Sequence, residues 1–89
     1  MSIEQPAAAA APGSVAQIVA LDLYREQREN LFPSLSSFQW WLRTHRRRAI
    51  EGGALLLVRG RYHVNPQRMD ACIAAAGEEA ARRQLVAAP

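Results

Sequence analysis

Four arginines crowd into a short stretch of this chain, and a glutamine and a tryptophan come just before them. The arginines are Arg43, Arg46, Arg47 and Arg48, and they follow Gln39 and Trp40. An arginine side chain carries a planar set of donors that bonds two acceptors at once, which suits phosphates and the edge of guanine. Glutamine pairs in a similar way with the edge of adenine. These residue types predict the chemistry of nucleic-acid recognition.

The other reactive residue types do not form a recognisable active site or metal site. The sequence has one cysteine and two histidines, and Cys72, His45 and His63 are widely spaced without a CxxC or HxxxH pair. There is no glycine-rich phosphate loop and no recognisable nucleophile triad. We therefore expect no enzymatic activity, no metal, no cofactor and no small-molecule ligand.

Positive charge is concentrated in the middle of the chain. The net charge is +3, and the stretch from Ser34 to Arg68 holds seven arginines and one acid, Glu51. The other four arginines are outnumbered by seven acids. Such a one-sided distribution favours a polyanionic partner. Charge alone leaves a second interpretation equally open, a solvated helix face without a partner.

A helix from Ser36 to Ile50 would place the chemistry on one face. Ser36 and Gln39 fit a capping box at its start. At helical spacing an apolar stripe turns toward a core, and it consists of Phe38, Trp41, Leu42, His45 and Ala49. The opposite face carries Gln39, Trp40, Arg43, Arg46 and Arg47, with Thr44 and Arg48 at its flanks. We expect this face to read a DNA major groove, with phosphates held by Ser34, Ser36, Ser37 and Thr44.

A short β-hairpin is predicted after this helix. The apolar runs 54–58 and 61–64 surround Arg59 and Gly60, and glycine accepts the positive φ of a tight hairpin turn. Arg59 and Arg61 flank Gly60, so both are predicted to project toward a DNA backbone or minor groove. Two ordinary hairpin arginines without a ligand remain the alternative.

The remaining elements complete one small domain over residues 14–86. Residues 1–13 are rich in alanine and proline and are predicted to be a disordered tail. Ser14 and Gln17 fit a capping box that starts a first helix reaching about Asn30, although the mixed apolar spacing there leaves a shorter, later helix open. Pro33 ends that helix.

The Gly52-Gly53 pair ends the second helix, and a third helix follows the hairpin. Asn65 is expected to cap this last helix, with Pro66 at its first position. Its core face consists of Met69, Ile73, Ala76 and Ala80. We expect Cys72 to be a small buried side chain and His63 to be exposed.

Two stretches resemble a known group of regulators. The residues Phe32–Arg43 and then Gly60–Pro66 resemble small phage- and plasmid-borne excisionase-like regulators, which have a winged helix-turn-helix fold related to MerR-type DNA-binding domains. The resemblance covers about Leu21–Ile73. It implies that the face from Ser36 to Arg47 reads DNA and that the wing around Arg59–Arg61 touches the backbone. It also implies a role in mobile-element excision or in transcription of neighbouring genes, although this chain's last helix extends past the usual stopping point.

Together these patterns predict a mainly α-helical protein with a short β-hairpin, a winged helix-turn-helix. The predicted function is sequence-specific binding of double-stranded DNA in the cytoplasm, in association with the nucleoid, since no apolar run approaches the ~20 residues of a membrane span. Self-association or a recombinase or polymerase partner is compatible with this interpretation. The alternative function is a protein-interaction adaptor, in which the Trp40–Arg43 face docks an acidic partner.

Overall fold

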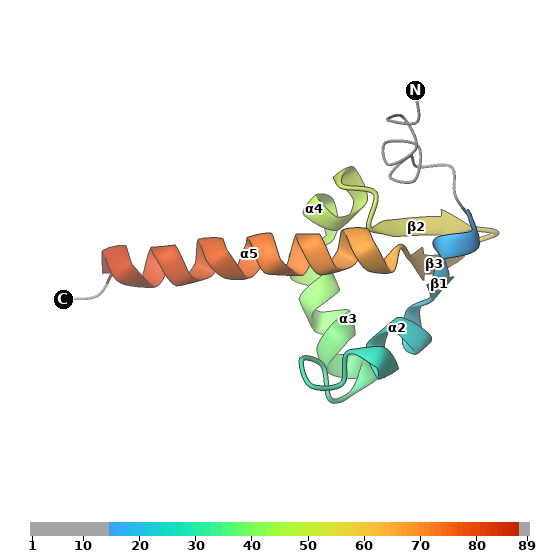
Figure 1. Cartoon of the computed structure of the whole chain (residues 1–89), viewed down its shortest axis with the longest axis horizontal. Helices are drawn as coiled ribbons and strands as arrows, with labels where there is room; N and C mark the ends of the chain where they lie inside the picture. The colour runs from blue at the N-terminus through green and yellow to red at the C-terminus, as the bar shows by residue number, and fades with distance from the viewer. Residues whose placement is uncertain (1–14, 88–89) are drawn as a thin grey trace, which may run out of the picture.

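Four α-helices and a three-stranded antiparallel sheet make up the part of the chain that the computed structural model describes, residues 15–87 (Figure 1). In chain order the elements are η1 (Val15–Gln17, a 3-10 turn), β1 (Val19–Ala20), α2 (Leu21–Gln27), α3 (Leu35–Thr44), α4 (Arg46–Glu51), β2 (Leu55–Val58), β3 (Arg61–Val64) and α5 (Pro66–Ala87). This mostly helical arrangement is compatible with the predicted helices and wing. The predicted tail over residues 1–13, and Ser14 with its predicted cap, lie outside the described residues.

The predicted hairpin is confirmed. Strands β2 and β3 pair antiparallel, with Leu55 opposite Val64 and Val58 opposite Arg61. Arg59 and Gly60 form the turn with φ angles of 54° and 78°. Two positive φ angles are typical of the type I′ turn, whose twist matches that of the strands it joins. The third strand, β1, was not predicted, because two residues are too short to show an alternating pattern.

The predicted first helix, from Ser14 to about Asn30, is wrong in its extent. The helix α2 spans Leu21–Gln27, which is the shorter and later alternative. It cannot begin earlier because Val19 and Ala20 pair with β3 as strand β1. After α2 the chain turns tightly, and the backbone amides of Leu31 and Phe32 both donate to the carbonyl of Arg28.

The predicted second helix differs from the structure at its start and near its end. Ser34 is the N-cap instead of Ser36: its Oγ accepts from the amide of Ser37 at 3.2 Å, and the Oγ of Ser37 accepts from the amide of Ser34 at 3.3 Å. The helix is also not continuous to Ile50, because it is interrupted at His45 between α3 and α4. There the hydroxyl of Thr44 donates to the carbonyl of Trp41 at 2.9 Å, and such side-chain bonds compete with the helical ladder.

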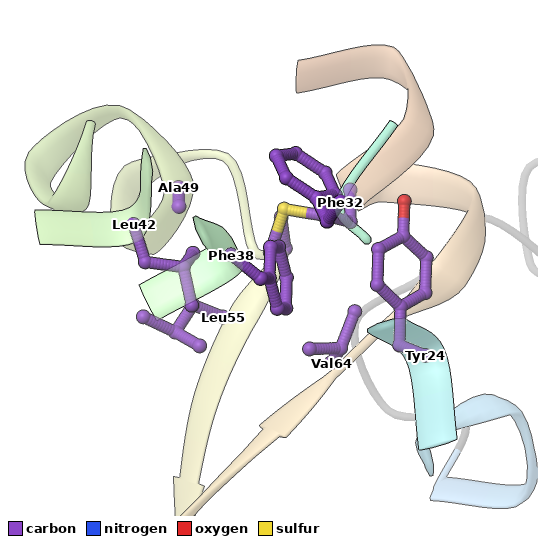
Figure 2. Packing of buried hydrophobic residues seen from close by; sticks show 9 residues of the cluster. Tyr24, Phe32, Phe38, Leu42, Ala49, Leu55 and Val64 are labelled. Atoms are coloured by element: carbon purple, nitrogen blue, oxygen red, sulfur yellow. The ribbon is translucent and has the colours of Figure 1, made fainter. Parts of the chain in front are cut away.

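Aromatic and aliphatic side chains from every layer meet in one core (Figure 2). The ring of Phe38 lies 4.8 Å from that of Phe32 and 5.5 Å from that of Tyr24, measured between centroids. Of the predicted stripe, Phe38, Leu42 and Ala49 are buried, whereas Trp41 and His45 are half-buried. This core fixes the orientation of α3 and so decides which of its side chains face solvent.

The long helix α5 packs on this core only over its first half. Asn65 caps it as predicted, since its Oδ1 accepts from the amide of Arg68 at 3.2 Å. Met69 and Ala76 are buried and Ile73 is half-buried, as expected for a core face. Ala80 was predicted to share that face but is exposed, because the helix has by then run beyond the rest of the molecule (Figure 1).

Candidate nucleic-acid interface

The solvent side of α3 carries a row of large polar and aromatic side chains. Ser36, Gln39, Trp40 and Arg43 are all exposed, and together they are called the α3 face below. Trp40 is 61% exposed, although a tryptophan is among the most costly side chains to leave in water. The buried side chains of α3 lie on the opposite side of the helix, so the amphipathic pattern determines which residues form this face.

The neighbouring Trp41 has a different environment. Its ring stacks on that of His45, with centroids 4.1 Å apart and an angle of 16° between the planes. The Nδ1 of His45 lies 2.9 Å from the carbonyl oxygen of Trp41. These contacts make His45 a structural residue at the α3–α4 interruption, as predicted from its place on the apolar stripe. The two tryptophans therefore differ in role, one in packing and one at the surface.

The three arginines of α4 are held in different ways. The guanidinium of Arg46 lies over the ring of Tyr62, 5.2 Å from its centroid, and donates to its hydroxyl. Arg47 is exposed and makes a loose ion pair of 3.7 Å with Glu51. Arg48 is tied to Glu79 on α5 and so is turned away from the α3 face. Sequence reasoning missed Tyr62, because no local pattern connects it with an arginine on another element.

A groove joins the α3 face to the hairpin. Its volume is about 220 Å³ and its walls combine polar and apolar side chains, which are Leu21, Gln39, Leu42, Arg43, Arg46, Leu55 and Tyr62. Gln39 and Arg43 come from α3, and Tyr62 comes from strand β3. The structure therefore brings two predicted contact residues of the helix beside the sheet. A bound polyanion lying along the groove would meet Arg43 and Arg46 together.

The two hairpin arginines lie on either side of Gly60 and border one surface depression. Arg59 is exposed in the turn, whereas Arg61 pairs with Val58 in the sheet. Because strand residues alternate between faces, Arg61 lies on the face opposite to Tyr62 and to the groove. It lines a separate surface depression with Val58, Arg59 and His63. His63 was expected to be exposed but is half-buried, and its Nδ1 lies 3.0 Å from the carbonyl oxygen of Arg61.

The predicted hydroxyl ligands are unequally available. Ser34 and Ser37 bond to each other across the start of α3, and Thr44 bonds to the carbonyl of Trp41. Within residues 15–87, Ser36 is the member of this set whose side chain makes no hydrogen bond. Ser36 is therefore the hydroxyl best placed to meet a ligand, and the other three stabilise the ends of the helix.

Two further arginines fasten the fold. Arg28 donates to both carboxylate oxygens of Asp70, at 2.8 and 2.6 Å, and lies 4.7 Å from the centre of the Tyr24 ring. The hydrogen bonds from Arg28 hold the pKa of Asp70 below its usual value, and Asp70 in turn raises the pKa of Arg28. Burial raises the pKa of Tyr24, whose hydroxyl also donates to Asp70. This cluster joins α2 to α5, while Arg25 donates to the carbonyl of Pro33 in the turn before α3.

Across residues 15–87, no three histidine, cysteine, aspartate or glutamate side chains come together in a way that would hold a metal ion. Cys72 is half-buried, and burial raises the pKa of its thiol. None of the described helices is long and apolar enough to cross a membrane.

The functional inference rests on these side chains and their placement. Comparison of the chain with protein-family models, with curated proteins and with solved structures finds no match.

Proposed function

We propose that this protein binds double-stranded DNA in a sequence-specific way, as a small winged helix-turn-helix regulator or accessory factor of a mobile element. In this proposal the α3 face enters the major groove, where Gln39 and Arg43 bond to base edges and Trp40 packs on apolar base atoms or sugars. The hairpin is the wing, and Arg59 at its tip contacts the backbone or the minor groove.

The exposed Trp40 between Gln39 and Arg43 is the observation that carries the proposal. Charged residues on a solvated face need no explanation, but an exposed tryptophan beside an arginine combines two residue types that are enriched at binding surfaces. Within the described residues, Arg43 and Arg59 make no ion pair and no side-chain hydrogen bond. Their donors are therefore available to a ligand without breaking an internal contact.

The order of the elements supports the same proposal. A short helix, a tight turn, the helix α3 and the short helix α4 precede the hairpin, and the groove beside Tyr62 links α3 to the hairpin. This is the arrangement in which a winged helix-turn-helix uses a helix and a wing on one duplex. The resemblance to excisionase-like regulators adds the mobile-element role to the proposal.

The expected affinity is modest and dependent on salt. Arg43, Arg46, Arg47 and Arg59 are the exposed arginines nearest to the proposed duplex. Each arginine that contacts a phosphate releases a counterion from the DNA. With three or four such contacts, the logarithm of the binding constant should fall with the logarithm of salt concentration at a slope of about −3 to −4. A single small domain offers few base contacts, so specificity of a few kcal/mol is the expected scale.

The test is a fluorescence-anisotropy titration, at several salt concentrations, with random duplexes and with duplexes selected from a random library. We expect Arg43→Ala to lose about 1–3 kcal/mol of preference for the selected sequence. Arg83→Ala is the control, because it removes the same charge from an exposed position of α5 that lies outside the α3 face. Loss of preference in both variants, or in neither, would contradict reading by the α3 face.

The adaptor function remains the second candidate, because tryptophan and arginine also dominate the energetically important positions of protein interfaces. The exposed Trp40 favours it as well. The same titration separates the two functions. An adaptor should bind every duplex feebly and without preference, while the Trp40→Ala variant should lose a protein partner instead of a DNA site.

A further inference from the structure

Beyond Glu79, which is bonded to Arg48, helix α5 extends away from the rest of the molecule (Figure 1). All side chains from Ala80 to Val86 are exposed, and Leu85 and Val86 are 79% and 87% exposed. A helix end of this kind gains nothing from packing, and isolated helical turns are marginal in water. Burying Leu85 and Val86 against another molecule would remove apolar area from water, which is favourable.

The residues of this segment are arranged to suit a copy of itself. Ala74, Glu78, Ala81 and Leu85 recur at intervals of four, three and four, which is the spacing of a coiled-coil seam. They are all exposed and lie away from Met69 and Ala76, the buried positions of α5. The acidic Glu78 lies on the N-terminal side of Ala80, at the centre of this stripe, and the basic Arg82 lies on its C-terminal side.

We propose that this stripe joins two copies of the chain through antiparallel pairing of their α5 helices. About a two-fold axis near Ala80, Leu85 of each copy lies across from Ala74 of the other, so a large side chain meets a small one. Arg82 of each copy then approaches Glu78 of the other, which gives two equivalent ion pairs. A two-fold contact requires a surface that complements itself, and this charge pattern provides one.

The charges favour a second copy over other occupants. In a two-fold pair, Glu78 and Arg82 each meet an opposite charge, whereas a uniformly acidic or basic partner would meet a like charge at one of these two positions. Glu79 is a second acid beside Glu78, but it is already bonded to Arg48 of its own copy and so does not compete for Arg82. Within the described residues neither Glu78 nor Arg82 makes an ion pair, so both are available to the second copy. The proposal does not depend on DNA binding.

Sedimentation equilibrium of the full chain over a wide range of protein concentrations tests the dimer. We expect the mass to rise from that of the 9.9 kDa monomer toward twice that value. The contact is small, so dissociation constants on the order of ten to a hundred micromolar are expected. Leu85→Gln removes one leucine from each side of the contact, so it should weaken association roughly a hundredfold, about tenfold for each leucine. Leu57→Gln is the control, since Leu57 is 63% exposed on the hairpin, far from the stripe.

A mixing experiment tests the ion pairs. Glu78→Arg alone and Arg82→Glu alone each place like charges opposite one another in a dimer, so each variant should associate more weakly than the original chain. An equimolar mixture of the two restores opposite charges across the contact and should associate roughly tenfold more tightly than either variant alone. Pairing of Glu78 with Arg82 inside one helix cannot produce this gain.

Any of the following results would overturn the proposal. One is a chain that keeps the monomer mass at every concentration up to the millimolar range. Another is a mixture that associates no better than its components, and a third is a Leu57→Gln variant as impaired as Leu85→Gln. Circular dichroism of each variant at the working temperature verifies that its helices are intact.

Discussion

At the scale of single residues, the arginines divide into those that fasten the fold and those that face solvent. Arg28 and Arg48 join helices through Asp70 and Glu79, whereas Arg43 and Arg59 have their donors free for a ligand. The sequence shows where these arginines lie along the chain, but the division depends on acids and aromatic rings far away in the sequence. A guanidinium that is already bonded within the protein would lose those bonds if it moved to a phosphate. Substituting Arg28 or Arg48 should therefore lower stability, whereas substituting Arg43 or Arg59 should chiefly lower DNA affinity.

Replacing Arg59 separates DNA binding from stability. Its φ of 54° is costly for most side chains but suits asparagine, which is favoured in type I′ turns. We therefore expect Arg59→Asn to unfold at the same temperature or a few degrees higher, while its affinity for all duplexes falls several-fold. Thermal denaturation and anisotropy measure the two effects.

Arg61→Ala is the natural comparison for that variant, because Arg61 lies on the hairpin face opposite to the groove. It should reduce affinity less than Arg59→Asn does. If Arg61→Ala proves the more damaging substitution, the duplex must approach the other face of the wing.

The Asp70 carboxylate makes stability dependent on pH on the acid side. Its pKa in the folded protein is lowered, chiefly by hydrogen bonds from Arg28, so its contribution is present above the unfolded value of about 4 and is lost as the pH falls below it. Asp70→Asn should cost about 1 kcal/mol at neutral pH, since the site is partly screened by solvent, and should flatten this acid dependence. Denaturant unfolding between about pH 3 and pH 7 measures this dependence of stability on pH.

Asp22→Asn is the matched control for this prediction, because Asp22 is exposed at the start of α2. The interpretation fails if the two variants show the same dependence on pH.

At the scale of the elements, two glycines give opposite predictions. Gly53 has a φ of 74°, and a methyl group there would collide with the guanidinium of Arg68. Gly77 lies inside α5 with open space around its Cα. We expect Gly53→Ala to destabilise the protein by about 1–3 kcal/mol and Gly77→Ala to stabilise it by about 0.5–1 kcal/mol. Equal effects in thermal or urea unfolding would contradict these two environments.

The elements also show what a sequence can and cannot predict here. The hairpin and the cap of α5 were predicted correctly, because both depend on local features. Gly60 adopts the positive φ of the turn, and Asn65 accepts a hydrogen bond from the nearby amide of Arg68. The two-residue strand β1 was not predicted, since it exists only through pairing with β3. The capping box was placed two residues late, because Ser36 and Gln39 match the usual pattern, whereas the box in the structure is formed by two serines, Ser34 and Ser37.

The candidate site follows the same rule. The exposure of Gln39, Trp40 and Arg43 could be predicted, since helical periodicity decides which residues oppose the buried Phe38 and Leu42. The stacking of Arg46 on Tyr62 could not be predicted, because it depends on how α4 packs against the sheet.

At the scale of the whole molecule, the two proposals combine into one arrangement. A two-fold pair of α5 helices would present two α3 faces, and symmetric dimers read sites with two inverted halves. On a duplex with both halves, Leu85→Gln should bind several-fold more weakly than the original chain. On a single half-site the two should bind equally, because one copy then makes all the contacts. Loss on both duplexes would indicate that Leu85 acts on folding instead of pairing.

The central claim is that the α3 face meets DNA, and the two tryptophans test it directly. The chain has two tryptophans, so its ¹H–¹⁵N NMR spectrum has two indole signals, which a Trp40→Phe variant assigns. On titration with a selected duplex, we predict that the exposed Trp40 indole shifts strongly and that the indole of Trp41, stacked on His45, shifts little. If the duplex binds while the Trp40 signal stays in place, or if no duplex changes the spectrum, the α3 face is not a DNA-reading surface.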